Sequence, residues 1–150
     1  MSRAEQFAPL STESAARWAK YGTWQRMYFP KLVGVLVEEV RADYCRMRLA
    51  FRPELEQPAG AVHGGAIATI LDSVVVPAVG SAYGPEQRYS TVDMHVQYLS
   101  ALVAEDGVAE GWVVRRGRST VFCEAELVGA ISGKIIARSM LTYAVAPPGP

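Results

Sequence analysis

Neither sign of charge predominates in this sequence, and cysteine is scarce. The 15 basic and 15 acidic residues cancel, so the net charge predicts no attraction to nucleic acid or to a membrane surface. The two cysteines, Cys45 and Cys123, form no Cys-x-x-Cys pair. That argues against a zinc site or a disulfide framework and favours two buried free thiols in a reducing compartment. No apolar run is long enough to span a bilayer, and no signal pattern opens the chain. We therefore expect a cytoplasmic protein without metal or other cofactor and without nucleic-acid or membrane partners.

Apolar residues, by contrast, are plentiful enough for one core. Half of the 150 residues are hydrophobic and a fifth are charged, which is typical of an ordinary globular domain. From Ala66 to Val79 almost every position is apolar or small. This segment predicts a helix buried on nearly all sides. Pro77 either kinks that helix or ends it early, because proline removes a hydrogen bond, and Gly80 or Gly84 closes the segment.

Two features of this predicted helix are unusual. Asp72 stands in its middle, and a buried carboxylate without partners is costly. The helix opens on His63-Gly64-Gly65, which leaves backbone N–H groups bare where the helix dipole attracts negative charge. Together they predict a reactive site on one helix. The structural alternative for Asp72 is a helix acid bonded to polar groups of a neighbouring strand.

The rest of the chain alternates with the period of β-strands. Apolar residues recur at every second position in six segments, which are residues 32–41, 45–51, 89–99, 107–116, 119–128 and 134–145. In the third segment, Thr91, Asp93, His95 and Gln97 are expected on one polar face. Two strands, a helix and four strands predict an α+β fold in which an antiparallel sheet of about six strands wraps around one long central helix. Sheet edges of this kind are consistent with an edge-to-edge dimer.

The motif Val62-His63-Gly64-Gly65, followed after six residues by Asp72, resembles the hotdog-fold acyl-coenzyme A (acyl-CoA) thioesterases. The most similar group is the phenylacetate-pathway (PaaI-like) and thioesterase superfamily member 2-like group. The likeness runs from about Pro30 to Val145 and includes Ser90–Met94, Tyr98–Ser100 and Arg116–Ser119. It implies a hydrolase that cleaves acyl-CoA to a free acid and CoA, and a homodimer that assembles further into a tetramer.

The resemblance also implies roles for individual residues. The N–H of Gly64 would polarise the thioester carbonyl, and Asp72 would activate water or attack the thioester itself. Thr91 would orient the water, and His63 would brace the helix start. Gln57 stands where the family usually has asparagine in the loop before the helix, and would contact the carbonyl or the water.

Substrate binding is expected from Gly65 and from the hairpin Arg116, Gly117, Arg118 and Ser119. Three arginines, Arg115, Arg116 and Arg118, cluster there. They form either a solvated turn or a site for the phosphates of CoA. His63 remains open as a general base, whereas the Asp93–His95 pair has no serine or cysteine nucleophile placed beside it.

The spacing of Gly64 and Asp72 predicts a shared site. Eight residues of helix separate them by about 12 Å, whereas one carbonyl under attack needs both groups within a few ångströms. Two antiparallel helices across a dimer meet that need, with Gly64 from one subunit and Asp72 with Thr91 from the other. Two alternatives stay open: a hotdog hydratase or dehydratase, and a non-catalytic acyl-CoA-binding or sensing dimer.

The N-terminal part is expected to be a separate lead-in. We assign residues 1–31 to a helical and aromatic lead-in, 32–146 to the hotdog domain and 147–150 to a tail. Residues 1–9 have no periodicity and are expected to be loose, and Ser11 or Thr12 caps a short helix through Tyr21. The aromatic residues between Gly22 and Pro30 form either a lid over the core or a wall of an acyl pocket.

Overall fold

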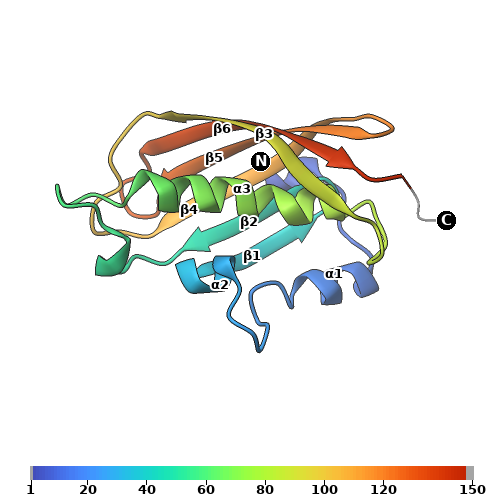
Figure 1. Cartoon of the computed structure of the whole chain (residues 1–150), viewed down its shortest axis with the longest axis horizontal. Helices are drawn as coiled ribbons and strands as arrows, with labels where there is room; N and C mark the ends of the chain where they lie inside the picture. Colours follow the sequence, from blue (N-terminus) through green and yellow to red (C-terminus); the bar gives the residue numbers. More distant parts are fainter. Residues whose placement is uncertain (1, 148–150) are drawn as a thin grey trace.

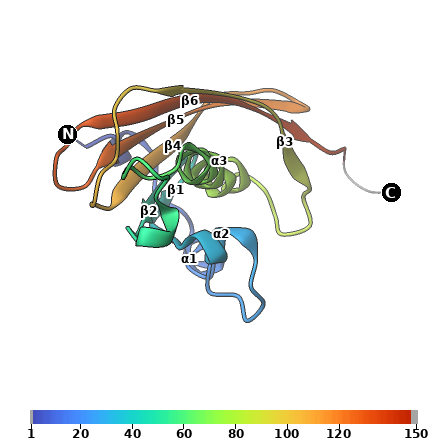
Figure 2. The same ribbon diagram turned by 60° about the vertical axis from the view of Figure 1, so that its left-hand side comes forward.

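One antiparallel sheet curves around a single long helix, α3 (Gly64–Gly80), as Figures 1 and 2 show. The computed structural model describes residues 2–147, so residues 148–150 of the expected tail lie outside the described part. The six strands lie in the order β1-β2-β4-β5-β6-β3. Their bounds are β1 Val35–Arg41, β2 Tyr44–Leu49, β3 Tyr89–Tyr98, β4 Gly107–Arg116, β5 Thr120–Gly129 and β6 Ile135–Val145. The expected α+β hotdog layout is confirmed.

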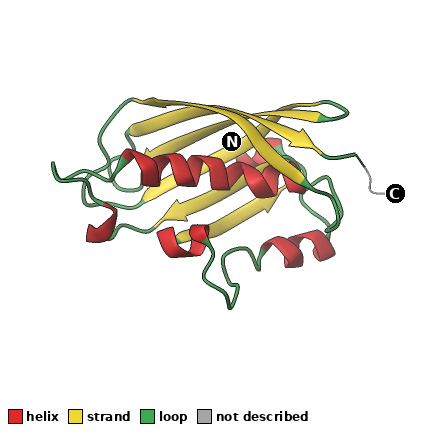
Figure 3. Cartoon of the chain, viewed as in Figure 1, coloured by secondary structure: helices red, strands yellow, loops and turns green. Residues whose placement is uncertain are grey.

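The remaining helices are short and lie away from the sheet interior. Figure 3 shows them as short segments separate from the central helix. They are η1 (Ala4–Gln6), α1 (Thr12–Trp18), α2 (Phe29–Val33) and η2 (Pro53–Leu55). The Ser11 hydroxyl accepts a hydrogen bond from the Ser14 N–H at 3.2 Å, so the predicted cap of α1 is confirmed, although the helix ends at Trp18 and not at Tyr21. No helix within residues 2–147 combines the length and apolarity that a membrane crossing requires.

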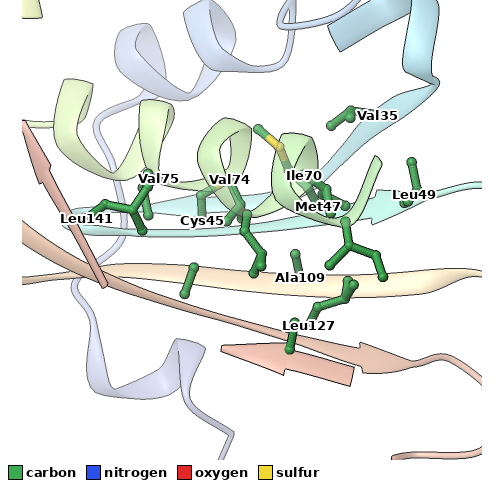
Figure 4. Close-up of a cluster of buried hydrophobic side chains, with 14 of the residues drawn as sticks. Val35, Cys45, Met47, Leu49, Ile70, Val74, Val75, Ala109, Leu127 and Leu141 are labelled. Atoms are coloured by element: carbon green, nitrogen blue, oxygen red, sulfur yellow. The ribbon is translucent and has the colours of Figure 1, made fainter. Parts of the chain in front are cut away.

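The core lies between α3 and the inner face of the sheet (Figure 4). In β2, Cys45, Met47 and Leu49 point inward and are at most 1% exposed, as their alternation predicts. Arg46 and Arg48 point outward and donate hydrogen bonds to Glu38 of β1 at 2.8 and 2.5 Å. This alternation fixes the register of the β1–β2 pair, because a slip of one residue would turn the apolar set to solvent.

The central helix is less enclosed than its composition predicts. Most of its residues are buried, but Gly65, Thr69, Asp72 and Val76 are partly or fully exposed. Their spacing of three or four residues puts them on one face of the helix. The expectation of burial on nearly all sides is therefore wrong for this face, which the sheet does not reach. Pro77 does not end the helix, because α3 continues to Gly80.

Two expectations for the N-terminal part are also wrong. Residues 2–9 are not loose, since Ala4 is 5% exposed and the Phe7 ring stacks on Tyr44 with centroids 5.2 Å apart. The strand expected from Leu32 begins at Val35, after the turn of helix α2. Gly34 has a φ of 87°, a left-handed conformation that ends the helix. Whether residue 31 or another position separates lead-in from domain stays a prediction.

Strand β3 contains a bulge that changes which side chains face the helix. Thr91 pairs with Tyr143 of β6 and Asp93 with Thr142, so Val92 is an extra residue on β3. As a result Thr91 lies on the face that carries Met94, whereas Asp93 lies on the outer face. The expected polar face that joined Thr91 to Asp93, His95 and Gln97 is therefore wrong at Thr91.

Candidate active site

The N-terminus of α3 carries a backbone N–H without a partner. His63 is the N-cap, and its Nδ1 accepts a hydrogen bond from the Gly65 N–H at 2.8 Å. Its carbonyl oxygen accepts from the N–H groups of Ala66 and Ile67 at 2.9 and 3.2 Å. Within residues 2–147, no acceptor is bonded to the Gly64 N–H. His63 thus takes up the Gly65 donor and leaves the Gly64 donor free for an anion or a polarised carbonyl.

Contacts on both sides of this N–H fix the helix start. The His63 N–H donates to the Leu55 carbonyl at 2.7 Å. The Tyr98 hydroxyl donates to the Gly64 carbonyl at 2.8 Å, and a Cβ at Gly64 would lie 3.3 Å from the Tyr98 ring. Strand β3 therefore holds the first turn of α3 in place. His63 contacts the helix start as expected, and its role in catalysis stays a prediction.

Asp72 is oriented by two hydroxyl groups. The Thr91 hydroxyl donates to its Oδ1 at 2.8 Å. The Tyr143 hydroxyl shares its proton between the same Oδ1 and the backbone carbonyl of Asp72, each at 3.2 Å. Among the described residues, none donates to Oδ2. One carboxylate oxygen is thus anchored to β3 and β6, and the other is available to a water or a substrate atom.

Tyr143 is the member of this group that the sequence argument missed. It is 1% exposed. Burial raises the pKa of its hydroxyl, and the nearby charge of Asp72 raises it further. The hydroxyl therefore stays protonated and serves as a donor. The available signal was the inward position of a tyrosine in the closing strand, because a buried Tyr O–H needs a partner.

Asp72 and Gly64 belong to one unbroken helix, so their separation is set by its rise. Eight residues at 1.5 Å each give about 12 Å. Gln57 lies in the loop before the helix, and its Oε1 accepts from the Ala59 N–H at 2.7 Å. Its amide oxygen is thus used inside the loop and is not bonded to Asp72.

The hairpin between β4 and β5 lies at the other end of α3. The Arg116 guanidinium forms an ion pair with Asp43 and donates to the Ala78 carbonyl at 3.3 Å. It also lies over the Tyr83 ring, 5.0 Å from its centroid. Arg116 therefore ties the C-terminal end of α3 to neighbouring segments. The other members of the expected binding hairpin, Gly117, Arg118 and Ser119, are exposed.

The two cysteines are not part of the proposed site. Cys45 and Cys123 are both free and buried. Burial raises the pKa of both thiols, that of Cys123 to about 12. Among residues 2–147, no three His, Cys, Asp or Glu side chains gather as a metal site would require.

Comparison with known proteins identifies the family. The profile of the thioesterase superfamily matches residues 59–134, about half of the chain and all of α3. The chain belongs to the thioesterase superfamily. The resemblance drawn from the His-Gly-Gly and Asp72 motif is thereby confirmed, and so is the expectation of a thioester-hydrolysing enzyme.

Individual members of this superfamily are similar over most of the chain. Human acyl-coenzyme A thioesterase 13 is 30% identical over 99 residues, which cover 65% of this chain and 69% of the relative. The orangutan (Pongo abelii) protein of the same name matches to the same extent.

Solved structures share the fold. The PaaI protein of the Escherichia coli phenylacetic acid degradation operon superposes with a TM-score of 0.79 at 14% identity, over 91% of this chain and 96% of that one. A conserved Pseudomonas aeruginosa protein superposes with a TM-score of 0.75 at 21% identity, over 91% and 99%. At these identities the superpositions speak for the fold alone.

Proposed function

We propose that this thioesterase hydrolyses acyl-CoA thioesters to the free acid and CoA. Membership of the superfamily and the similarity to acyl-coenzyme A thioesterase 13 support the substrate class. The observation that carries the proposal is the pairing on one helix of an unsatisfied N–H at Gly64 with a carboxylate, Asp72, whose Oδ2 is open. The first suits a developing oxyanion, and the second suits activation of water or direct attack.

The active site is completed by a second subunit. About 12 Å of helix between Gly64 and Asp72 is too far for one carbonyl to meet both. In a dimer with antiparallel α3 helices, Gly64 of one subunit polarises the thioester carbonyl. Asp72 of the other subunit then activates the water that attacks the carbonyl carbon, or attacks that carbon itself. The less buried face of α3, which carries Gly65, Thr69 and Asp72, is the surface on which such a partner helix would lie.

Thr91 and Tyr143 position the acid in this mechanism. Both hydroxyls bind Oδ1, so the carboxylate presents Oδ2 in a fixed direction toward the attacking water. His63 holds the helix start by accepting from Gly65, so Gly65 contributes to the shape of the site rather than as a donor. Gln57 is a candidate contact to the substrate through its side-chain NH2 group, because the bond from the Ala59 N–H uses only its Oε1.

We assign the nucleotide end of CoA to the exposed hairpin of residues 117–119, where Arg118 supplies the positive charge that would bind the phosphates. Arg116 is engaged with Asp43 inside the subunit, so it supports the hairpin. If Arg118 binds phosphate, Arg118→Ala raises KM more than it lowers kcat, because a contact remote from the reacting bond contributes equally to ground and transition states.

Thiol release from acyl-CoA tests the function. Wild-type protein should release CoA with first-order dependence on enzyme, and Asp72→Asn, which keeps the shape and both hydroxyl contacts available, should lose most turnover. Binding of acyl-CoA without release would instead support an acyl-CoA sensor, and hydration of an enoyl-CoA would support a hydratase. Near-full activity of Asp72→Asn would refute the assignment of the acid.

A further inference from the structure

Helix α1 lies near the C-terminal half of α3 and the start of β3 (Figure 1). Residues of these three segments line an aromatic pocket. Its volume is about 340 Å³, and its walls include Trp18, Tyr21, Trp24, Val76 and Tyr89. That volume falls in the lower part of the range of roughly 300–1,000 Å³ that small-molecule sites occupy.

Close packing at Gly80 and two hydrogen bonds from Arg17 hold the walls of the pocket together. A Cβ on Gly80 would lie 2.2 Å from the Tyr89 hydroxyl and 2.4 Å from the Trp18 ring, so only glycine lets these two walls meet there. Arg17 donates to the carbonyls of Gly80 and Tyr83 at 3.1 and 2.9 Å, which fastens α1 to the end of α3. The Tyr21 and Trp24 rings then meet edge to face, 4.9 Å between centroids.

The two elements that carry the acid and its partner both lead into this pocket. Val76 lies one turn beyond Asp72 on the same face of α3, about 6 Å along the helix. Tyr89 lies two residues before Thr91 on the same face of β3, about 7 Å along the strand. The Tyr89 ring is 6.3 Å from that of Tyr143, whose hydroxyl binds Asp72.

Tyr21, in the N-terminal lead-in, also lies near Asp72. Burial, with a smaller contribution from the charge of Asp72, raises the pKa of Tyr21 to about 12. The lead-in thus reaches the neighbourhood of the proposed acid, and the space beside it is apolar.

We propose that this aromatic pocket receives the apolar acyl group of the thioester and limits its length. The proposal rests on the acyl-CoA thioesterase function above. With the carbonyl carbon at Asp72, the first acyl carbons bridge to Val76, and the following ones enter the space between Tyr21, Trp24 and Tyr89. Each methylene that enters is removed from water, whereas a chain longer than the pocket must leave it past α1.

The expected result is a chain-length optimum. On a series of butyryl-, octanoyl- and palmitoyl-CoA, kcat/KM should rise by about fourfold for each methylene that the pocket buries and then fall for palmitoyl-CoA. Val76→Phe, at a half-buried wall position, fills the pocket near the acid. It should lower kcat/KM for octanoyl-CoA by at least about tenfold more than it lowers kcat/KM for butyryl-CoA, because only the longer chain must pass residue 76. Trp24→Ala, which opens the far wall, should raise the rate on palmitoyl-CoA.

The matched control is Ala16→Phe, which adds the same ring on the exposed side of α1 and should leave the profile unchanged. Equal losses on all three substrates, or an unchanged profile in both wall variants, would overturn the pocket assignment and leave the lead-in as a lid over the core. Failure of wild-type protein to release thiol from any acyl-CoA would instead overturn the function. The pocket is then tested separately by tryptophan fluorescence, which should change with octanoyl-CoA but not with CoA alone.

Discussion

The proposed oxyanion donor is a single backbone N–H, and one substitution can delete it without removing the helix. Gly64 is the first residue of α3, a position where proline is favoured because its N–H has no helical acceptor. His63 has a ψ of 136°, which a residue before proline readily adopts. Gly64→Pro therefore removes the donor while keeping the backbone path.

The matched control is Gly64→Ala, which adds the same Cβ but keeps the N–H. In both variants this Cβ lies 3.3 Å from the Tyr98 ring, so Tyr98 must shift by a few tenths of an ångström in each. Loss of one oxyanion donor costs about 10²–10³ in kcat. We expect that loss for Gly64→Pro relative to Gly64→Ala, with equal melting temperatures within a few degrees.

The assay is thiol release detected with a disulfide reagent on octanoyl-CoA. Variants should first be compared by circular dichroism, so that a lost fold is not mistaken for lost catalysis. Equal kcat values for Gly64→Pro and Gly64→Ala would refute the reasoning, because proline replaces the proposed N–H donor by a ring carbon whereas alanine keeps the donor.

Three further predictions concern the acid, the thiols and the core. Thr91→Val should lower kcat by about tenfold to hundredfold, since it removes a hydrogen bond to a charged group; Tyr143→Phe should cost less, because its bond is longer, and the opposite order in steady-state assays would contradict this. Cys45 and Cys123 should not react with the disulfide reagent at pH 8 in folded protein, because burial keeps them protonated. They should react once guanidinium unfolds the protein, and reaction of the folded protein would contradict their burial. Gly111→Ala should lower the free energy of unfolding by about 1–3 kcal/mol in urea titrations, because its Cβ would lie 2.8 Å from the side chains of Val74 and Val75; unchanged stability would show that α3 can move away from β4.

The fold followed from periodicity wherever one face of an element is buried. The alternation in β2, with Cys45 and Met47 inward, predicted the strand and its orientation, because burial on one face leaves a pattern of period two. The same logic failed at Thr91, since a bulge shifts the pattern by one residue and leaves no mark in composition. It also failed at Val33. The alternating valines predicted a strand there, but Val33 ends helix α2 and Gly34 forms its left-handed C-cap.

The proposed site was predictable to the extent that it lies on one helix. The free N–H of Gly64 and the acid Asp72 are encoded by the motif itself. Tyr143 was not, because it lies 71 residues away in sequence and reaches Asp72 only through the pairing of β6 with β3. The sequence also did not show that Arg116 lies far from Gly64. The strand that carries Arg116 runs to the C-terminal end of α3, where Arg116 contacts Ala78.

The central claim is that each active site combines Gly64 of one subunit with Asp72 of another. It is tested most directly by mixing two inactive variants, Asp72→Asn and Gly64→Pro, after unfolding and refolding them together. In a mixed dimer one site has both defects and the other has neither, so an equal mixture should regain about a quarter of wild-type activity if subunits pair at random. Activity no greater than the sum of the two separate variants would place both groups in a single subunit and contradict the account.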